Sequence, residues 1–319
     1  MRPNTDPVLA ELCHEIQSNQ HFTILSHHGP DGDGLGAMFA LYWGLSSLGK
    51  EVVIASSSQP SAIYSCIPGI EKLSRNPRLD ITQRIITLDA GEPSRVEYYD
   101  SAFQHRVIMI DHHASNSQFG AWNWLKLDIS STSEMVAWLL LELGVAFTPN
   151  IANSLLVGIY FDTGNLQHNV YPSTMEMVAR LAQSGGNPHR IRRALTHTKP
   201  AEALKVWGSA LSSLCILEEA STAYAVVAKT DLRQVSLPLP DMALDQLSNY
   251  MSTIQEAGSS LLLTERKENQ YKGSLRSENF KNVDVQAIAQ KFGGGGHIRA
   301  SGFKHDGSVD EILAILKES

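Results

Sequence analysis

Short apolar segments alternate with longer helical patterns along the first half of the chain. The short segments are rich in β-branched side chains, and the longer ones repeat their apolar positions with a period of about 3.6 residues. This alternation is typical of a parallel sheet with helical crossovers. The predicted strands are His21–Ser26, Glu51–Ala55, Arg84–Leu88 and Arg106–Ile110, and the predicted helices are Leu35–Leu48, Ser133–Leu143 and Ile151–Tyr160. We therefore expect an α/β fold with a doubly wound parallel sheet in the N-terminal domain.

The segment Ser184–Pro188 is the clearest interruption of this pattern, because its Gly-Gly and Asn-Pro pairs favour turns. Residues 188–217 then predict connecting helices, and short strands and helices follow. The expected elements are a strand at Ala223–Lys229, a hairpin of Ser259–Thr264 and Gln270–Arg276, and helices at Val283–Lys291 and 309–317. The predicted division is a first domain at 1–186, a helical linker at 187–217 and a smaller α/β domain at 218–319.

Composition supports an ordinary globular protein of about two domains, because 319 residues are divided at about 150 per domain. The chain is 43% hydrophobic and 18% charged, unlike disordered or fibrous sequences. Its three scattered cysteines offer neither a disulfide framework nor a CxxC zinc site, which favours a reducing compartment. No apolar run approaches the ~18 residues of a membrane span, and the N-terminus lacks the apolar core of a signal peptide. We expect a cytoplasmic protein with no membrane partner.

The charge is distributed unevenly around a formal net value of −7. The excess of acidic residues lies within residues 1–190, whereas residues 266–304 contain eight basic and three acidic residues. Domains that bind duplex DNA are usually strongly basic, so duplex DNA is not an expected partner. The distribution suits an acidic, metal-rich site and a basic patch for a phosphorylated ligand. The alternative is an ordinary fluctuation of surface charge along the chain.

Carboxylates and imidazoles cluster where the predicted strands and one helix end. They form four segments: His27 to Asp33, Asp89, Asp111-His112-His113, and Asp162. In open α/β sheets, ligands bind outside the carboxyl ends of the strands, so these side chains are expected to converge. A single aspartate of this kind is more often a helix cap or a turn residue. Four such segments, two of them with histidine, favour a common site.

The donor types of this site indicate which metal it would bind. Carboxylates and imidazoles without a thiolate favour Mn²⁺, with Mg²⁺ or Co²⁺ as substitutes. Six ligands exceed what one metal with open positions for substrate can use, and they suit two metals about 3.5–4 Å apart that share a bridging water. Such a pair activates water and neutralises phosphoryl oxygens. The residues therefore predict hydrolysis of a phosphoester.

A glycine run at 293–296 precedes His297 and Arg299. Consecutive glycines can expose backbone N–H groups to an anion, and Arg276 offers a guanidinium for bidentate phosphate binding. The run lacks the GK[ST] ending of a P-loop, so it does not predict an NTPase. The alternative is a flexible loop with solvated charges.

Taken together, these motifs resemble the DHH phosphoesterase superfamily, in particular members with a DHH-associated C-terminal domain. The resemblance rests on five elements in order: His27 to Ala37 (HHGPDGDGLGA), Asp89, Asp111-His112-His113, Asp162, and Gly293 to Phe303 (GGGGHIRASGF). It extends over essentially the whole chain. A DHH triplet alone is a weak signal, whereas five elements in order with similar spacing are a strong one.

The resemblance implies a role for each matching residue. One metal would be held by His27, Asp31 and Asp89, and the second by Asp33, His112 and Asp162, with Asp89 bridging both. His28 would be a neighbour, although the two adjacent histidines could exchange roles. His113 would face the substrate phosphate or the leaving oxygen, and Asp111 would fix the tautomer of a histidine. The substrate would be gripped across an interdomain cleft by Arg276, His297, Arg299, Gly294, Gly295 and Gly296.

Within the superfamily, the chain resembles oligoribonucleases that also act on 3′-phosphoadenosine-5′-phosphate (pAp). This implies a Mn²⁺-dependent enzyme that hydrolyses RNA or DNA oligonucleotides of two to five nucleotides to mononucleotides, and pAp to AMP and phosphate. Alternative enzymes are a cyclic di-AMP or pApA phosphodiesterase and a pyrophosphatase or polyphosphatase. A nucleotide sensor without turnover is another alternative, but it would be expected to lack metal ligands. A homodimer is the default assembly.

Overall fold

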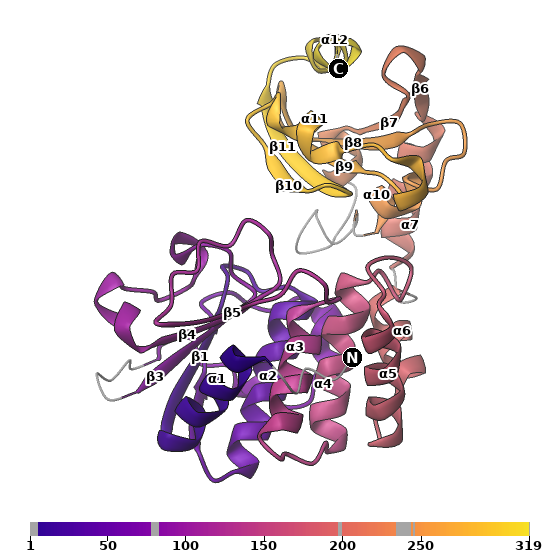
Figure 1. Cartoon of the computed structure of the whole chain (residues 1–319). Helices are drawn as coiled ribbons and strands as arrows, with labels where there is room; N and C mark the ends of the chain where they lie inside the picture. Colours follow the sequence, from indigo (N-terminus) through magenta and orange to yellow (C-terminus); the bar gives the residue numbers. More distant parts are fainter. Residues whose placement is uncertain (1–5, 78–82, 197–199, 234–243, 245, 319) are drawn as a thin grey trace. The chain divides into compact units, whose positions relative to one another are not determined.

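The computed structural model describes residues 6–77, 83–196, 200–233, 244 and 246–318. The chain divides into two compact units, Met1–Thr198 and Lys199–Ser319 (Figure 1). Each unit has its own sheet and its own hydrophobic core. No helix among the described residues combines the length and the apolar character that a membrane span requires.

The first unit is built on a parallel sheet in the order β2-β1-β3-β4-β5. Its strands are β1 (His21–Ser26), β2 (Glu51–Ile54), β3 (Arg84–Leu88), β4 (Val107–Asp111) and β5 (Trp122–Leu125). The chain reverses its direction of progress across the sheet beside β1, as it does in doubly wound α/β folds. The predicted parallel sheet is therefore confirmed, and β5 adds an edge strand that the apolar pattern does not indicate.

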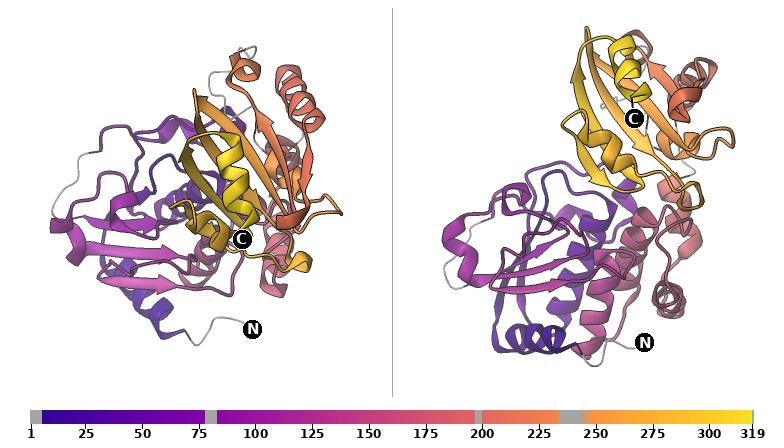
Figure 2. Two further views of the ribbon diagram at one scale, coloured as in Figure 1. Left: turned by 90° about the horizontal axis from the view of Figure 1, so that it is seen from above. Right: turned by 45° about the horizontal axis from the view of Figure 1, so that its top comes forward.

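Helices of the first unit begin where local sequence supplies a cap. Ser131 accepts a hydrogen bond from the backbone N–H of Glu134, and Thr148 accepts one from Ile151, which satisfies donors at two helix starts. The helices are α1 (Pro7–Ser18), α2 (Gly32–Ser47), α3 (Thr132–Glu142), α4 (Pro149–Asp162), α5 (Pro172–Gln183) and α6 (Pro188–Thr196). Helices α2, α3 and α4 pack side by side (Figures 1 and 2).

Alternating side chains of the strands enter two different cores. On β4, Ile108 and Ile110 pack into the large core with the helices, whereas Val107 and Met109 face the opposite side. That opposite side is covered by the segment that includes Val96, Tyr99 and the short 3₁₀ helix η4 (Ser101–Arg106). Because both faces are covered, the strands are buried and their ends are the places where polar side chains can reach a ligand.

The second unit contains a mixed sheet in the order β10-β11-β9-β8-β7-β6. All its neighbouring strands are antiparallel except β7 and β8. Its elements are α7 (Ala201–Ser212), β6 (Cys215–Leu217), β7 (Thr222–Val227), α8 (Lys229–Arg233), α10 (Leu247–Met251), β8 (Ser259–Lys267), β9 (Gln270–Arg276), α11 (Val285–Gln290), β10 (Gly295–His297), β11 (Ala300–Asp306) and α12 (Val309–Lys317). The predicted hairpin is present as β8 and β9.

The segment expected to be a helical linker is shared between the two units. Ile191 and Leu195 of α6 belong to the core of the first unit, while Val206 and Ala210 of α7 belong to a core of the second. Cys215–Leu217, expected within connecting helices, forms strand β6 instead. It pairs antiparallel with β7, whose backbone groups would otherwise lack partners on that edge.

Candidate metal centre

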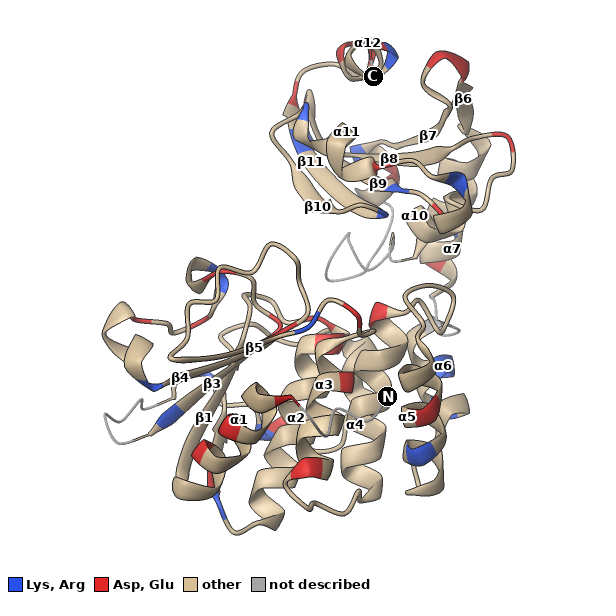
Figure 3. Cartoon of the chain, viewed as in Figure 1, with Lys and Arg blue, Asp and Glu red and all other residues tan. Residues whose placement is uncertain are grey.

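The predicted metal ligands come from five elements, β1, α2, β3, β4 and α4, that end or begin near one edge of the parallel sheet. His27 follows β1, Asp89 follows β3, and His112 follows β4. Asp31 caps α2, because its Oδ1 accepts from the backbone N–H of Asp33 at 2.9 Å. Figure 3 shows acidic residues, in red, in the loops near the ends of α3 and α4. The doubly wound topology therefore brings residues that are distant in sequence to one place.

Two groups of donor atoms share one carboxylate. His27 Nε2 lies 3.8 Å from an oxygen of Asp31 and 3.8 Å from Oδ2 of Asp89. His112 Nε2 lies 3.0 Å from Asp162 Oδ2 and 3.8 Å from Asp89 Oδ1. The groups whose ligand atoms lie within 4.8 Å of one another are His27 with Asp31 and Asp89, Asp33 with His112 and Asp162, and Asp89 with His112 and His113. Asp89 thus uses its two oxygens toward different neighbours.

The adjacent histidines His27 and His28 have different surroundings. His27 is buried in the cluster, whereas the side chain of His28 is 64% exposed and lies 3.7 Å from Glu97. Glu97 is itself buried and accepts hydrogen bonds from Ser57 and Ser58, which lowers the pKa of its carboxyl despite the opposing effect of burial. The structure therefore brings His27 to the other predicted ligands and directs His28 to Glu97.

His113 and Asp111 form a hydrogen-bonded pair behind the cluster. His113 Nδ1 is 2.7 Å from Asp111 Oδ1 and 3.5 Å from Asp89 Oδ1. Asp111 also accepts from the backbone N–H of His112 at 2.8 Å and from Asn116 Nδ2 at 2.5 Å. Asn116 also donates to the backbone carbonyl of Ala90. It therefore links the Asp111-His112-His113 triplet to the residue after Asp89. Asn116 is not among the residues that the motifs predict, although it lies only three positions after the triplet.

Asp33 rests on the N-terminus of α3. Its Oδ2 accepts from the backbone N–H of Thr132 at 2.7 Å, and its Oδ1 accepts from Ser133 at 2.9 Å. The positive end of the helix dipole favours a carboxylate there. Thr132 Oγ1 also lies 3.3 Å from Asp89 Oδ1. Each carboxylate oxygen retains a second lone pair, so these contacts are compatible with binding of a cation.

Two buried carboxylates of the cluster, Asp33 and Asp89, have raised proton affinities. Burial and the negative charge of Asp162 raise the pKa of Asp33 to about 7. Burial and the charge of Asp33 likewise raise the pKa of Asp89 well above its ordinary range. Burial alone would lower the pKa of His112, but the carboxylate of Asp162 outweighs it and raises the pKa to about 9. The protein groups alone therefore leave an excess of negative charge in the cluster.

The chemistry of this donor set fits divalent cations. Carboxylate oxygens and imidazole nitrogens suit Mn²⁺ and Mg²⁺, and the described residues of the cluster include no thiolate. Within the described part of the chain, the buried His112 Nε2 has no aligned hydrogen-bond partner. A buried nitrogen without such a partner is costly unless a ligand satisfies it. The geometry of the cluster and this nitrogen both indicate a metal site.

The predicted substrate-binding residues lie in the second unit, at one end of its sheet. Arg276 is in register with Ala300, and Ala300 is in register with His297, so the three residues form a row across β9, β11 and β10. Residues directly opposite one another project from the same face of a sheet. The register therefore places Arg276 and His297 on one face, separated by the small side chain of Ala300.

The two predicted arginines make structural contacts as well. Arg276 Nε donates to Asn249 Oδ1 at 2.8 Å, and its Nη1 donates to the carbonyl of Leu275. Burial lowers the pKa of Arg276. Arg299 donates to Asn279 Oδ1 and to the carbonyl of Val283. Among the described residues, the hydrogen-bond acceptors of these two arginines are neutral amide and carbonyl oxygens, which suits guanidinium groups that receive a phosphate.

The glycine run forms part of the sheet. Gly295 and Gly296 pair with Gly302 and Ser301 of β11, and β10 is an edge strand. A Cβ atom at Gly294 would collide with the backbone of Gly302 and with Phe303, so a larger residue does not fit there. The run thus has a packing role in addition to the anion-binding role that the sequence predicts. That the two units face a common cleft stays a prediction.

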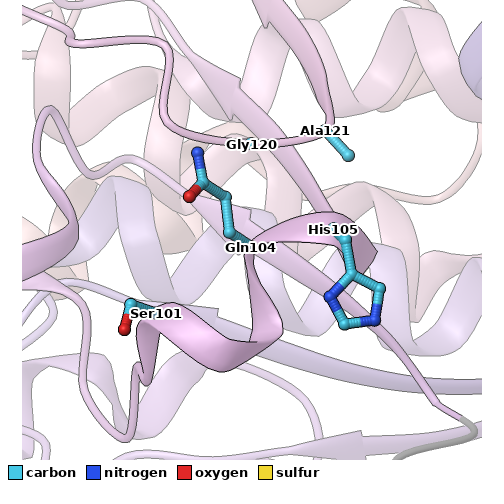
Figure 4. A pocket seen from close by; sticks show the side chains of 5 residues that line it. All are labelled: Ser101, Gln104, His105, Gly120 and Ala121. Carbon is cyan, nitrogen blue, oxygen red and sulfur yellow. The ribbon is translucent and has the colours of Figure 1, made fainter.

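Figure 4 shows a pocket that involves none of the predicted site residues. It is lined by Ser101, Gln104, His105, Gly120 and Ala121, which come from η4 and from the turn before β5. These side chains offer one imidazole and no carboxylate. They do not form a second candidate for a metal-dependent reaction.

Comparison with known proteins supports the resemblance to DHH phosphoesterases that the motifs indicate. The profile "DHH family, N-terminal domain" matches residues 21–159, and the profile "DHHA1 domain" matches residues 234–319. The bifunctional oligoribonuclease and PAP phosphatase NrnA of Thermus thermophilus is 30% identical over 92% of this chain and 89% of its own length. The cyclic-di-AMP phosphodiesterase GdpP of Geobacillus thermodenitrificans is 24% identical over 95% of this chain and 48% of its own.

A solved structure shows that the fold occurs elsewhere. An exopolyphosphatase-related protein from Bacteroides fragilis has a TM-score of 0.88 to this chain, with 23% sequence identity, over 98% of this chain and 95% of its own. At this level of identity, the likeness concerns the fold.

Proposed function

From the premise that the chain belongs to the DHH family and is a hydrolase of phosphoester bonds, we propose that it cleaves very short nucleotides with two bound divalent cations. The proposed substrates are oligonucleotides of two to five residues, released as mononucleotides, and pAp, converted to AMP and phosphate. Mn²⁺ is the proposed ion, with Mg²⁺ or Co²⁺ as substitutes.

The position of Asp89 is the observation that carries this proposal. Its two oxygens each lie 3.8 Å from a different histidine, His27 on one side and His112 on the other. A carboxylate between two ligand groups is the arrangement that two adjacent cations require. When bound, such cations supply an activated water and neutralise phosphoryl oxygens. His27, Asp31 and Asp89 would hold one cation, and Asp33, His112 and Asp162 the other.

His113 and Asp111 would act on the substrate side of this cluster. Asp111 accepts from Nδ1 of His113, which fixes the tautomer of the imidazole and its orientation. Asn116 in turn holds the carboxylate of Asp111. We assign His113 to contact with the scissile phosphate or the leaving oxygen, and Asp111 to orientation of that imidazole.

The second unit would recognise the remote part of the substrate. Arg276 and His297 share one face of the sheet, and both could bind a terminal phosphate. Arg299 and the backbone of Gly294, Gly295 and Gly296 are the further predicted contacts. The full-length similarity to a protein named oligoribonuclease and PAP phosphatase supports these substrates over others. Duplex DNA is not a proposed partner, and a homodimer remains the default assembly.

A cyclic di-AMP or pApA phosphodiesterase is the second candidate. It is favoured by the similarity to a cyclic-di-AMP phosphodiesterase over nearly the whole of this chain. The same metal cluster would serve either reaction. The two candidates therefore differ in how the second unit accommodates the nucleotide.

A single assay series tests the proposal. The purified protein is incubated with Mn²⁺, with Mg²⁺ or with EDTA, and with pAp, pApA, a five-nucleotide RNA, cyclic di-AMP and pyrophosphate as separate substrates. We expect Mn²⁺-dependent release of AMP from pAp and pApA, with pyrophosphate unchanged. Turnover of cyclic di-AMP in preference to pAp would support the second candidate. Turnover of pyrophosphate alone would overturn the proposal.

A further inference from the structure

Exposed apolar side chains interleave with cationic ones in the second unit. Phe280 is 78% exposed, which is the largest exposure among the large apolar side chains of the described residues. Tyr250 and Ile298 are also more than half exposed. Tyr250 follows Asn249, the partner of Arg276, and Ile298 lies between His297 and Arg299. Exposed aromatic rings near basic groups are typical of surfaces that bind single-stranded nucleic acid.

The turn that carries Phe280 is held from both sides. Phe280 lies in the 3₁₀ helix η6 (Asn279–Lys281). Before it, Asn279 accepts from Arg299 Nε at 3.2 Å. After it, Lys281 Nζ donates to the carbonyl of Ser252 at 2.8 Å and also to that of Ile254. The exposed ring is therefore displayed from an ordered turn rather than from a freely moving loop.

This turn leaves the sheet at the end where the predicted phosphate-binding residues lie. Arg276 is the last residue of β9 and His297 the last of β10, and both belong to the row through Ala300. The backbone N–H of Ser277 donates to the carbonyl of Arg299 at 3.0 Å, which adds one more hydrogen bond between the two chain segments at that end of the sheet. Only Glu278 and Asn279 then separate Ser277 from the ring along the chain. Phe280 thus lies in the turn that leaves the cationic end of the sheet.

We propose that Phe280 is the platform on which a nucleobase of the substrate stacks. This inference rests on the proposed function and specifies how its substrate is recognised. A base presents a flat π face that stacks on an aromatic ring whatever its sequence, and nearby cations bind the attached phosphate. Lys281 Nζ lies 5.8 Å from the centroid of the ring, so a cation accompanies the platform itself. The occupant is a nucleoside phosphate rather than a phosphate without a base.

The test compares variants of the full-length protein on substrates with and without a base. Phe280→Ala removes the ring, and Phe280→Trp keeps an aromatic surface. Ile216→Ala is the matched control, because Ile216 is an exposed apolar residue on β6, at the opposite edge of the same sheet. KM and kcat are measured with pAp and with ribose 3,5-bisphosphate, which lacks the base.

We expect Phe280→Ala to raise KM for pAp about tenfold or more, in line with the loss of one base–aromatic stack. KM for ribose 3,5-bisphosphate should stay within about twofold, since that compound makes no stack. Phe280→Trp should restore KM for pAp, and Ile216→Ala should change neither substrate. An unchanged KM for pAp, or an equal rise for both substrates, would overturn the stacking role.

A binding measurement separates failure of this inference from failure of the proposed function. The fluorescence of 2-aminopurine riboside 3′,5′-bisphosphate is followed in EDTA, where no turnover is expected. Stacking should quench the fluorescence with the wild-type chain and with Phe280→Trp, but not with Phe280→Ala. If wild-type protein hydrolysed no nucleotide yet quenched in this way, the proposed activity would fail and the platform would stand. Equal quenching by Phe280→Ala would reject the platform regardless of activity.

Discussion

Gly158 on α4 lies directly against the carboxylate of Asp33 on α2. A Cβ atom at position 158 would come 2.5 Å from Asp33 Oδ1 and would collide with the hydroxyl of Ser133. Asp33 is at the same time held by two backbone N–H groups at the start of α3. The position of this predicted ligand is thus set by a close approach of three helices, in which one residue must lack a side chain.

Gly158→Ala should therefore displace Asp33 and Ser133 from their present contacts. We expect the free energy of unfolding to fall by about 1–3 kcal/mol, the usual cost of overpacking, and Mn²⁺ affinity to fall with it. Gly208→Ala on α7 is the control, because a Cβ there meets nothing within 4 Å. That change should instead stabilise by about 0.5–1 kcal/mol. Thermal unfolding and metal titration measure both, and unaltered metal binding in Gly158→Ala would refute the positioning of Asp33 by this contact.

Asp89→Asn separates stability from function at the shared carboxylate. Asparagine has nearly the same shape and tolerates the left-handed backbone at this position, where φ is 57°. Its neutral amide replaces the buried carboxyl of Asp89, whose pKa is raised by burial and by the charge of Asp33. At pH 8 in EDTA, we expect the variant to be more stable than the wild type, because the amide carries no charge into the buried cluster.

The same variant should lose most of its hydrolytic activity with Mn²⁺. An amide is a weak ligand that cannot bridge two cations, so a fall of at least about a hundredfold is expected. Calorimetric unfolding in EDTA and AMP release from pAp are the two measurements. Activity close to that of the wild type would exclude Asp89 as a bridge, even if the gain in stability were observed.

The stability of the metal-free protein should decrease as the pH rises. The pKa of Asp33 increases from its ordinary value of 3.8 to about 7 on folding, so its protonated form stabilises the fold, and this contribution is lost between about pH 4 and 7. The pKa of His112 increases from 6.5 to about 9, and its contribution is lost between those two values.

Thermal unfolding in EDTA from pH 5 to 9 measures this dependence. The midpoint should fall steadily across the range, and Asp33→Asn should flatten the part below pH 7. Saturating Mn²⁺ should reverse the slope, because cations bind the deprotonated carboxylates and release their protons. A midpoint that rises with pH in EDTA would contradict the assignment of raised pKa values to this cluster.

The central strands of the first sheet could be predicted from sequence because burial on both faces makes them continuous apolar runs. Both His21–Ser26 and Arg84–Leu88 have the predicted bounds. The edge strand β5 (Trp122–Leu125) carries Asn123 among its four residues, so its pattern is not an apolar run. Strand β10 consists of Gly295–His297, whose composition favours a loop. Its conformation depends on pairing with β11, which no local pattern reports.

The same distinction applies to the site. Ligand residues such as Asp31 and Asp89 stand in short motifs next to strand ends, where residue type and position both indicate chemistry. The groups that orient them come from far away: Thr132 and Ser133 lie about a hundred positions from Asp33 and reach it through backbone N–H groups. A backbone donor has no side-chain signature. Gly158 likewise appears in sequence as one more residue of an apolar helix.

Two hydrogen bonds within the second unit hold the guanidinium of Arg276. Its Nε donates to Asn249 Oδ1 at 2.8 Å and its Nη1 to the carbonyl of Leu275, which orients the plane of the guanidinium. If this orientation serves phosphate binding, Arg276→Ala should raise KM for pAp by the equivalent of about 1–3 kcal/mol. Asn249→Ala should raise KM for pAp by the equivalent of about 1 kcal/mol, because the charge of Arg276 remains but one hydrogen bond that orients it is lost.

The control for this pair lies on the same strand. Gln270→Ala removes a half-buried side chain at the opposite end of β9, where Gln270 donates to Asp306. KM and kcat are measured with pAp and with bis-p-nitrophenyl phosphate, which has no terminal phosphate for Arg276 to bind. The two site variants should change KM for pAp much more than kcat for either compound, and Gln270→Ala should change neither. If both site variants left KM for pAp unaltered, Arg276 would be a structural residue of the second sheet. A parallel loss of kcat on both compounds would instead indicate that these contacts maintain the fold.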